Sequence, residues 1–432
     1  MSESGYRLLS RTQLFGITLL IIFALNCFPH FSLAGDYRNS SHGSASSGVD
    51  RSSIDFKYST FSKGNCAHCH EQHASLGGIE PNPVGGAASS YAVFATEENL
   101  CFACHKSGGP AQTDIKSQFL KTNPHPKLTD PATEGIHHPW EKTSSDFTGV
   151  NRHAECTDCH NPHAATAANP LFNVTGVNPS NGGAGSLSTF TFVTVTDPDQ
   201  QYKVCFKCHS DWTDPSRLTA VQFNPANDSF HWVEKDKLAS YTPNIIGTGK
   251  GIYYLANFNT TSAPVMMPRT GFSYTSANLR VLALRCSDCH GTDGATASTP
   301  EGPHGSSVAK ILKVPLGSTY TVWGPTANMN NAWCFNCHDR TPFTSSSDTS
   351  SGMRTPGKSL HNLHCNKAPG AGGNCVDCHL LSPHGQTGAG TANQRRHLLD
   401  PAKFRENVDL ETSGSWHQHS NSGGSWVIPS CT

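Results

Sequence analysis

The stretch "ECTDCHNPHAA", residues 155–165, carries the pattern that organises this chain. Cys156 and Cys159 are separated by two residues and followed by His160, and a second histidine, His163, comes three residues later. Cys-x-x-Cys-His is the attachment site of a c-type haem, in which the two thiols hold the porphyrin and the histidine binds the iron. A single copy is also compatible with a thioredoxin-like redox pair or with half a zinc site.

The pattern occurs seven times, always with its histidine, which a set of zinc ribbons would not require. Fourteen of the seventeen cysteines lie in these motifs, so we predict seven covalently bound haem c groups. The cysteines that would attach the porphyrins are Cys66, Cys69, Cys101, Cys104, Cys156, Cys159, Cys205, Cys208, Cys286, Cys289, Cys334, Cys337, Cys375 and Cys378. The motif histidines that would each bind one iron are His70, His105, His160, His209, His290, His338 and His379.

The first 34 residues read as a secretory signal peptide, which agrees with haem attachment outside the cytoplasm. Arg7 and Arg11 precede the apolar run "LFGITLLIIFALNCF", and residues 32–34 form a small-x-small cleavage site. The run is short for a bilayer span, which needs about 20 residues. The alternatives are a retained anchor helix and a lipid on Cys27. We expect an exported protein of the periplasm, the outer-membrane surface or the extracellular space, with no transmembrane segment in the mature chain.

Composition argues against a large side-chain core, because the chain has 39 glycines and 27 prolines and lacks long amphipathic helical patterns. Haem rings would supply the core, and the apoprotein would be largely unfolded. We therefore expect a multihaem cytochrome c fold, irregular and mostly coil, with short helices at the haem motifs, a few short strands and a haem-stack core. Removing residues 1–34 changes the net charge from −1 to −2, and haem propionates add more negative charge, so nucleic acid is not an expected partner.

The motifs are of two kinds that alternate along the chain. One kind has a polar residue before the first cysteine ("NCAHCH", "ECTDCH", "RCSDCH", "NCVDCH"), and the other has an apolar residue there and an internal phenylalanine ("LCFACH", "VCFKCH", "WCFNCH"). This order predicts three two-haem units and a terminal half unit. The predicted segments are a signal peptide (1–34), a flexible N-terminal segment (35–62), unit 1 (63–145), unit 2 with an insertion (146–280), unit 3 (281–360) and a single-haem C-terminal unit with a tail (361–432).

Composition also predicts some local structure. The stretches "NSSHGSASSGVDRSS" (39–53) and "GVNPSNGGAGSLS" (176–188) read as flexible segment and loop, and "TFTFVTVT" (189–196) reads as a short strand. The long gap between Cys208 and Cys286 reads as an irregular insertion with a hairpin or two, where partner-specific surface would lie.

With these alternating pairs, the chain resembles the doubled Cys-x-x-Cys-His family of multihaem cytochromes c over residues 62–386. The members of that family are periplasmic, outer-membrane-associated or extracellular proteins of bacteria that respire metals and other external acceptors. The resemblance implies redox-partner cytochromes or an external acceptor such as a metal oxide, and it leaves self-association into filaments open.

His163 raises a separate question, because His160 already occupies one side of its own haem. At a spacing of three residues both side chains lie on one face of a helical turn, so His163 cannot reach the opposite side of that ring. We predict that it binds a neighbouring haem, either the haem of Cys205 and Cys208 or the last haem of the preceding unit. Its other ring nitrogen should donate a hydrogen bond, as in most metal-bound imidazoles.

A comparable histidine follows every motif, which predicts seven distal iron ligands and bis-histidine haems. The predicted distal ligands are His73, His138 (or His137), His163, His231, His304, His361 (or His364) and His384. Further candidates in reserve are His125, His153, His397, His417 and His419, whereas His68, inside a motif, reads as polar surface. Met266 or Met267 is an alternative ligand for one haem.

Two functions fit this pattern. The first is electron transfer without catalysis, through closely spaced bis-histidine haems to a periplasmic or extracellular acceptor. The second is a multihaem reductase for nitrite, hydroxylamine or a sulfur oxyanion, which needs one iron with an open face. All seven motifs keep their histidine and no cluster of Arg, Tyr and Lys marks a substrate pocket, so electron transfer is favoured. Cys365 and Cys431, the mature cysteines outside the motifs, are expected to form a disulfide.

Overall fold

The computed structural model describes the first five motifs and the segments around them. The described residues are 37–70, 92–93, 95–127, 143–149, 152–227, 229–231, 233–236, 284–293, 300, 302–313, 347, 354–355, 358–359 and 384–386.

Several predictions fall outside these residues. They include the signal peptide, most of the insertion before Cys286 and the whole of the sixth and seventh motifs. The predicted haem-binding residues of those two motifs, which lie outside the described residues, are Cys334, Cys337, His338, Cys375, Cys378 and His379. The other candidates outside them are the distal ligands His73, His137, His138, His361 and His364, the reserve ligands His397, His417 and His419, the alternatives Met266 and Met267, and the disulfide partners Cys365 and Cys431.

Each described motif contributes residues to a short helix. The helices at the motifs of the first kind are the 3-10 helix η3 (Cys66–His68), α4 (Cys156–Cys159) and α7 (Cys286–Cys289). Asp158 and Asp288 explain the aspartate before the second cysteine, because their carboxylates accept the backbone N–H of Glu155 and Arg285 at 2.9 and 2.7 Å. These bonds satisfy donors that a helix N-terminus otherwise leaves unpaired.

The motifs of the second kind lie at the ends of helices that begin before the cysteines. These helices are α2 (Glu97–Phe102) and α5 (Gln201–Cys205), and the latter follows the 3-10 helix η8 (Pro198–Gln200). The phenylalanine after the first cysteine, Phe102 or Phe206, is buried in both. The apolar character of these motifs therefore comes from side chains that pack inward.

A two-stranded hairpin forms the largest regular element in the described part of the chain. Strand β2 (Val174–Ser180) pairs antiparallel with β3 (Thr189–Val195), with Val177 opposite Phe192. The strand predicted at 189–196 is confirmed, but the predicted loop 176–188 is wrong at its start, since residues 176–180 belong to β2. The apolar partners Phe190 and Phe192 across the hairpin outweigh the turn-like composition of these residues.

The hairpin covers a small side-chain core around α5. Val177, Tyr202, Phe206, Ala220, Phe223 and Val233 form one buried cluster, and Leu171, Val174, Val195 and Val204 form a second. Ala220 lies in the short helix α6 (Thr219–Gln222). The expectation that side chains would build little core thus needs correction for residues 171–233, where a conventional core exists.

The N-terminal segment predicted to be flexible is instead packed. Residues 37–62 contain two 3-10 helices, η1 (Tyr37–Asn39) and η2 (Phe56–Thr60), and the side chains of Ser40, Arg51 and Tyr58 are buried. The Arg51 guanidinium lies 3.9 Å from the centre of the Tyr58 ring. Local contacts, such as this cation–π pair, order a stretch that has the composition of a linker.

Very short ladders join segments that are far apart in the sequence. Strand β1 (Asn123–Pro124) pairs with β5 (Gly305–Ser306), and β4 (Ser229–Phe230) pairs with β8 (Gly385–Gln386), both antiparallel. A further two-residue pair is formed by β6 (Arg354–Thr355) and β7 (Lys358–Ser359), and the remaining 3-10 helices are η5 (Gln118–Leu120), η6 (Ser144–Phe147) and η11 (Ala309–Ile311).

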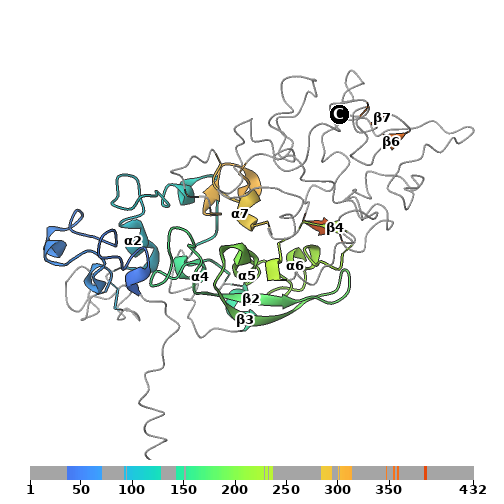
Figure 1. The fold of residues 1–432 in the computed structure, drawn as a ribbon, viewed down its shortest axis with the longest axis horizontal. Coiled ribbons are helices and arrows are strands. Elements are labelled where there is room, and N and C mark those ends of the chain that lie inside the picture. Colours follow the sequence, from blue (N-terminus) through green and yellow to red (C-terminus); the bar gives the residue numbers. More distant parts are fainter. Residues whose placement is uncertain are drawn as a thin grey trace, which may run out of the picture.

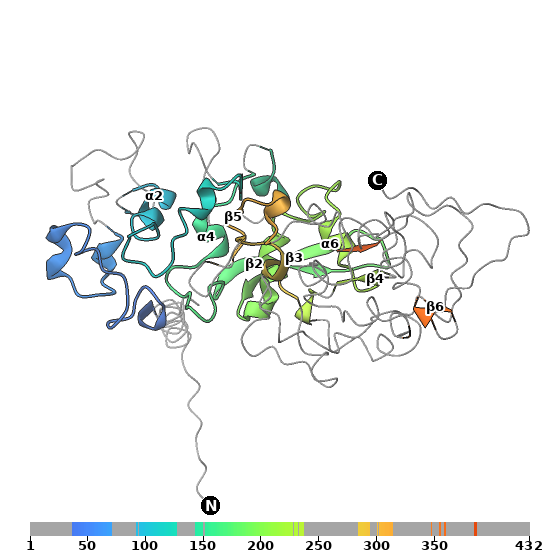
Figure 2. The same ribbon diagram turned by 90° about the horizontal axis from the view of Figure 1, so that it is seen from above.

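From the N-terminal segment to α6, the labelled helices follow the order of the chain in space. In both ribbon views the N-terminal segment lies at one end, followed by α2, α4 and then the hairpin with α6 (Figures 1 and 2). Helix α7, from the fifth motif, lies beside α5, from the fourth (Figure 1). None of the helices in the described residues is long and apolar enough to cross a membrane.

Candidate haem-binding sites

Each motif histidine in the described part of the chain has a second histidine ring close to it. The centres of the two rings are 5.9–6.1 Å apart in all five cases. Every pair joins one Cys-x-x-Cys-His histidine to a histidine outside the motifs, which a random meeting of imidazoles would not produce. The pairs are His70 with His163, His105 with His42, His160 with His304, His209 with His125, and His290 with His384.

The constant separation of these rings fits ligands on opposite sides of one metal ion. A metal–imidazole nitrogen bond is about 2 Å, so two such ligands in line through an ion place their ring centres roughly 6 Å apart. The angle between ring planes varies from 13° for His70 and His163 to 72° for His105 and His42. Two imidazoles bound to one ion can rotate about the line through the ion, so the angle between their planes can vary at one separation. In direct ring–ring packing, by contrast, the separation of the ring centres depends on that angle.

The second nitrogen of several of these rings is held by a hydrogen bond. His160 Nδ1 lies 2.9 Å from the Pro170 carbonyl oxygen and His290 Nδ1 lies 2.9 Å from that of Lys310. Equivalent contacts join His42 to Pro162, His125 to Pro126 and His384 to the Gln222 amide oxygen, at 3.1–3.2 Å. A carbonyl partner fixes the proton on Nδ1, which leaves Nε2 as the nitrogen available to a metal.

For several of the paired histidines, loss of solvation favours the neutral form that a metal requires. Loss of solvation lowers the pKa of His304 to about 3 and that of His209 and His384 to about 4. The pKa values of His160 and His290 are also lowered, with burial as the main cause. A neutral imidazole has a free lone pair at neutral pH, so metal binding would not have to displace a proton.

The cysteines of the five described motifs are free thiols, and all but Cys66 are partly buried. Burial raises the pKa of Cys69 and Cys208 to about 11 and that of Cys159 to about 12. Among the described residues, no cluster of three or more histidine, cysteine or carboxylate side chains could hold a metal ion. Two histidines per site are what a haem needs, because the porphyrin nitrogens complete the iron's coordination. The residues present therefore fit haem attachment at the five described motifs.

Three of the predicted distal histidines belong to these pairs. They are His163, His304 and His384. A fourth, His231, lies next to His384, to whose carbonyl its backbone N–H donates at 2.8 Å. The motif histidines that His231 could serve, His338 and His379, lie outside the described residues, so its role as a ligand stays a prediction.

The recipient predicted for His163 needs correction. Its ring lies beside His70 of the first motif, whereas both recipients named from the sequence have other partners. His209, at the motif of Cys205 and Cys208, pairs with His125, and His105, at the last motif of the preceding unit, pairs with His42. The spacing of His163 from His160 indicates that it cannot bind the haem expected at its own motif. It does not indicate which of the other motifs lies nearest to His163. No hydrogen bond of the His163 ring occurs within the described structure, in contrast to the five rings above.

The structure adds one ligand candidate, His42, and brings forward another, His125. His42 precedes the first motif, so a search for histidines that follow motifs misses it. A signal for it exists, because "HGS" at 42–44 recurs at 304–306. A Cβ atom at Gly43 would lie 1.8 Å from the Tyr37 carbonyl oxygen, and one at Gly305 would lie 2.0 Å from that of Gln118. Only glycine allows the backbone to pass this close.

His68, read from the sequence as polar surface, is fully buried, and both of its ring nitrogens are occupied. The Arg51 backbone N–H donates to Nδ1 at 3.1 Å, and Nε2 lies 3.0 Å from the Ser62 carbonyl oxygen. The Arg51 side chain also donates to the His68 carbonyl at 3.3 Å. His68 is therefore a structural residue that anchors the N-terminal segment to the first motif.

The ladders explain how histidines from distant segments reach their partners. In the first ladder the His125 N–H donates to the His304 carbonyl at 3.0 Å, and the two side chains lie beside the histidines of consecutive motifs, His304 beside that of the third and His125 beside that of the fourth. The second ladder holds His231 and His384 in the same register. The paired segments follow motifs that are three apart in the series, the second and fifth in the first ladder and the fourth and seventh in the second. The first ladder thereby places two histidines beside motifs that lie between its two strands in the sequence.

Searches against protein-family models, curated proteins and solved structures find no match to this chain. The chemistry of the site therefore rests on its own residues, which provide five thiol pairs and five pairs of imidazoles with ring centres 5.9–6.1 Å apart.

Proposed function

We propose that this protein is a heptahaem c-type cytochrome, a member of the doubled Cys-x-x-Cys-His multihaem group, that carries electrons through closely spaced bis-histidine haems. The observation that carries the proposal is the set of five histidine pairs with one common separation. Haem c, when bound, supplies one-electron chemistry at its iron. Two histidine ligands leave no open position for a substrate, which favours electron transfer over catalysis.

The residues would divide the work in a simple way. The cysteine pairs would hold the porphyrins covalently, and the motif and distal histidines would supply the two protein ligands of each iron. Because the distal ligand comes from a different segment than the motif, each haem would tie together two parts of the chain. The hydrogen bonds from Nδ1 to oxygen atoms would fix the orientation of the rings of His42, His125, His160, His290 and His384.

The seven predicted haems, export of the mature protein and its exchange of electrons with another cytochrome or an external acceptor belong to the same proposal. They are supported by the motif count and the N-terminal 34 residues of the sequence. Self-association into filaments is compatible with a chain of haems, and the histidine pairs do not depend on it.

Two measurements test the proposal. The intact mass of the mature protein should exceed that of the polypeptide by seven haems, which should survive denaturation and acid-acetone extraction. The EPR and visible spectra of the oxidised protein should show only low-spin iron and should not change on addition of cyanide or nitrite. A high-spin signal that cyanide converts would reveal an open haem and favour the reductase, and a protein without covalent haem would refute both functions.

A further inference from the structure

A hydrogen bond between side chain and backbone joins the second motif to the third, and a similar bond joins the fourth to the fifth. The Glu97 carboxylate accepts the Thr157 backbone N–H at 2.7 Å and the Thr157 hydroxyl at 2.8 Å. The Gln201 amide oxygen accepts the Ser287 backbone N–H at 2.7 Å. Glu97 and Gln201 each come from one predicted two-haem unit, and Thr157 and Ser287 each from the next.

The four residues occupy matching positions in the repeat. Glu97 and Gln201 each stand four residues before the first cysteine of their motif, as the first residue of α2 and of α5. Thr157 and Ser287 each follow the first cysteine of the next motif, as the second residue of α4 and of α7. Four residues before the sixth motif the sequence again carries an acceptor side chain, Asn330.

The acceptors satisfy N–H groups that a helix N-terminus leaves without an intrahelical partner. In α4 and α7 these groups are capped by a side chain from the preceding unit. The first motif has no preceding unit, and there the equivalent N–H, of Ala67, is accepted by its own Asn65 at 2.9 Å. The backbone N–H that follows the first cysteine is thus accepted by a residue of the preceding unit at the third and fifth motifs. At the first motif it is accepted by a residue two positions earlier in the chain.

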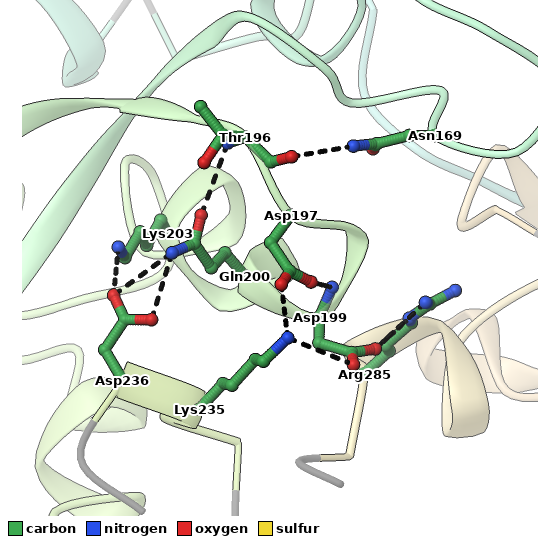
Figure 3. A network of polar contacts seen from close by, with 9 residues as sticks. All are labelled: Asn169, Thr196, Asp197, Asp199, Gln200, Lys203, Lys235, Asp236 and Arg285. Atoms are coloured by element: carbon green, nitrogen blue, oxygen red, sulfur yellow. Dashed lines mark hydrogen bonds and ion pairs between the residues drawn. The ribbon is translucent and has the colours of Figure 1, made fainter. Parts of the chain in front are cut away.

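The caps bring the first cysteines of neighbouring units together. Cys156 and Cys286 directly precede the capped residues Thr157 and Ser287. The pKa of the Cys156 thiol is raised chiefly by its neighbour Cys101, and that of the Cys205 thiol chiefly by its neighbour Cys286. These four thiols are all haem-attachment positions, so the edges of two porphyrins would meet at each junction. At the second junction one ion pair adds to the cap, since Arg285 lies 2.9 Å from Asp199 of the preceding unit (Figure 3). Within that preceding unit, Lys235 pairs with Asp197 and Asp199.

We propose that Glu97 and Gln201 are positioning residues that hold successive two-haem units edge to edge, with Cys101 against Cys156 and Cys205 against Cys286, for electron transfer between the units. The inference rests on the proposed function. The step moves one electron from the reduced iron of one haem to the oxidised iron of the next, and no bond forms or breaks. The caps act through backbone geometry and touch no iron ligand.

The test compares Glu97→Ala with Glu97→Gln and with Asn99→Ala, an exposed residue of the same helix. Each protein is purified with its haems, and electron redistribution along the chain is followed optically after rapid partial reduction. Glu97→Ala should slow one inter-haem phase several-fold and weaken the magnetic coupling between two haems in EPR. Glu97→Gln should restore most of the rate, because Gln201 already fills this role with an amide. Asn99→Ala should match the parent.

Intact mass separates failure of this inference from failure of the proposed function. Seven haems in Glu97→Ala together with parental kinetics and EPR would overturn the positioning role and leave the cytochrome intact. Absence of covalent haem in the parent would overturn the function itself. If Glu97→Ala does not mature, Thr157→Val removes only the hydroxyl contact; it should slow the same phase to a smaller extent, and parental kinetics in this variant would refute the inference.

Discussion

The first and second predicted units use the same motifs but are held together differently. Residues 152–236 have a hairpin and two buried apolar clusters around α5. The described residues between 37 and 127 contain no strand longer than two residues, and their packing depends on turns, on the buried His68 and on the contact between Phe102 and Phe119, whose ring centres are 5.7 Å apart. The second unit is therefore supported by a side-chain core, whereas the described part of the first depends on local contacts.

The ion pairs described for the two units also differ, because that of Lys203 lies within the second unit and that of Lys121 reaches another unit. The second unit carries the network of Figure 3, in which Lys203 pairs with Asp236 and Gln200 donates to the same carboxylate. From the first unit, Lys121 reaches Asp293, beyond the fifth motif, at 2.8 Å. The separation of the histidine pairs is therefore the same in both units, whereas the contacts that support the backbone differ. Three predictions test this contrast.

The largest effect is expected from truncating the motif phenylalanines. Phe206→Ala should lower the free energy of unfolding by about 3–5 kcal/mol, because Phe206 is 1% exposed within the core. Phe102→Ala should cost less, about 1–2 kcal/mol, since fewer buried apolar side chains surround it. Guanidinium unfolding of the haem-loaded proteins measures both. Phe206→Leu, which nearly conserves volume, is the control and should cost less than about 1.5 kcal/mol. Equal losses in the two alanine variants would remove the contrast between the units.

A second prediction concerns two candidate ligands, His42, which the sequence analysis did not name, and His125, which it named only as a reserve candidate. His42→Met and His125→Met should each keep seven haems and raise the reduction potential of one haem, since methionine in place of histidine raises it. The two variants should affect different haems, so the double variant should shift two. Potentiometric titration with near-infrared spectroscopy detects the change of ligand. Ser41→Ala, with an exposed side chain, is the control. Parental potentials in His42→Met would show that His42 binds no iron.

The smallest effect concerns the ion pair that joins Lys121 of the first predicted unit to Asp293 of the third. Hydrogen bonds from Lys121 and from the Ser307 backbone outweigh the effect of burial and lower the pKa of Asp293 to about 2, from an ordinary value of 3.8. Its contribution to stability is therefore complete above the ordinary value and is lost as the pH falls toward 2. Lys121→Met should remove no more than about 1 kcal/mol of this contribution, because both side chains are partly exposed.

Thermal unfolding between pH 5 and pH 2 measures this difference. The parent should lose more stability than Lys121→Met as the pH falls, and the two curves should converge at the acid end. Arg217→Met, which removes a more exposed ion pair with Asp214, is the matched control and should follow the parent. Parallel curves for the parent and Lys121→Met would mean that the pair contributes nothing to folding.

Features that depend on residues close together in the sequence could be predicted from the sequence alone. The motifs, their alternation, the recurring aspartate at 158 and 288 and the strand at 189–196 follow from residue types at fixed short spacings. The candidate distal ligands His163, His304 and His384 also follow from position, since each trails a motif by a short interval. The three-residue spacing from His160 is also enough to predict that His163 would not bind the haem expected at Cys156 and Cys159.

Which histidine side chains lie next to each other depends on the tertiary structure and could not be predicted from the sequence. His163 lies beside His70, His304 beside His160 and His384 beside His290, all across long stretches of sequence. Such pairings depend on two-residue ladders, on glycines that let backbones pass and on side chains such as Glu97 that cap another unit's helix. These contacts join residues whose separation in the chain leaves no periodic signal, so composition misread the N-terminal segment as a linker and passed over His42 as a ligand.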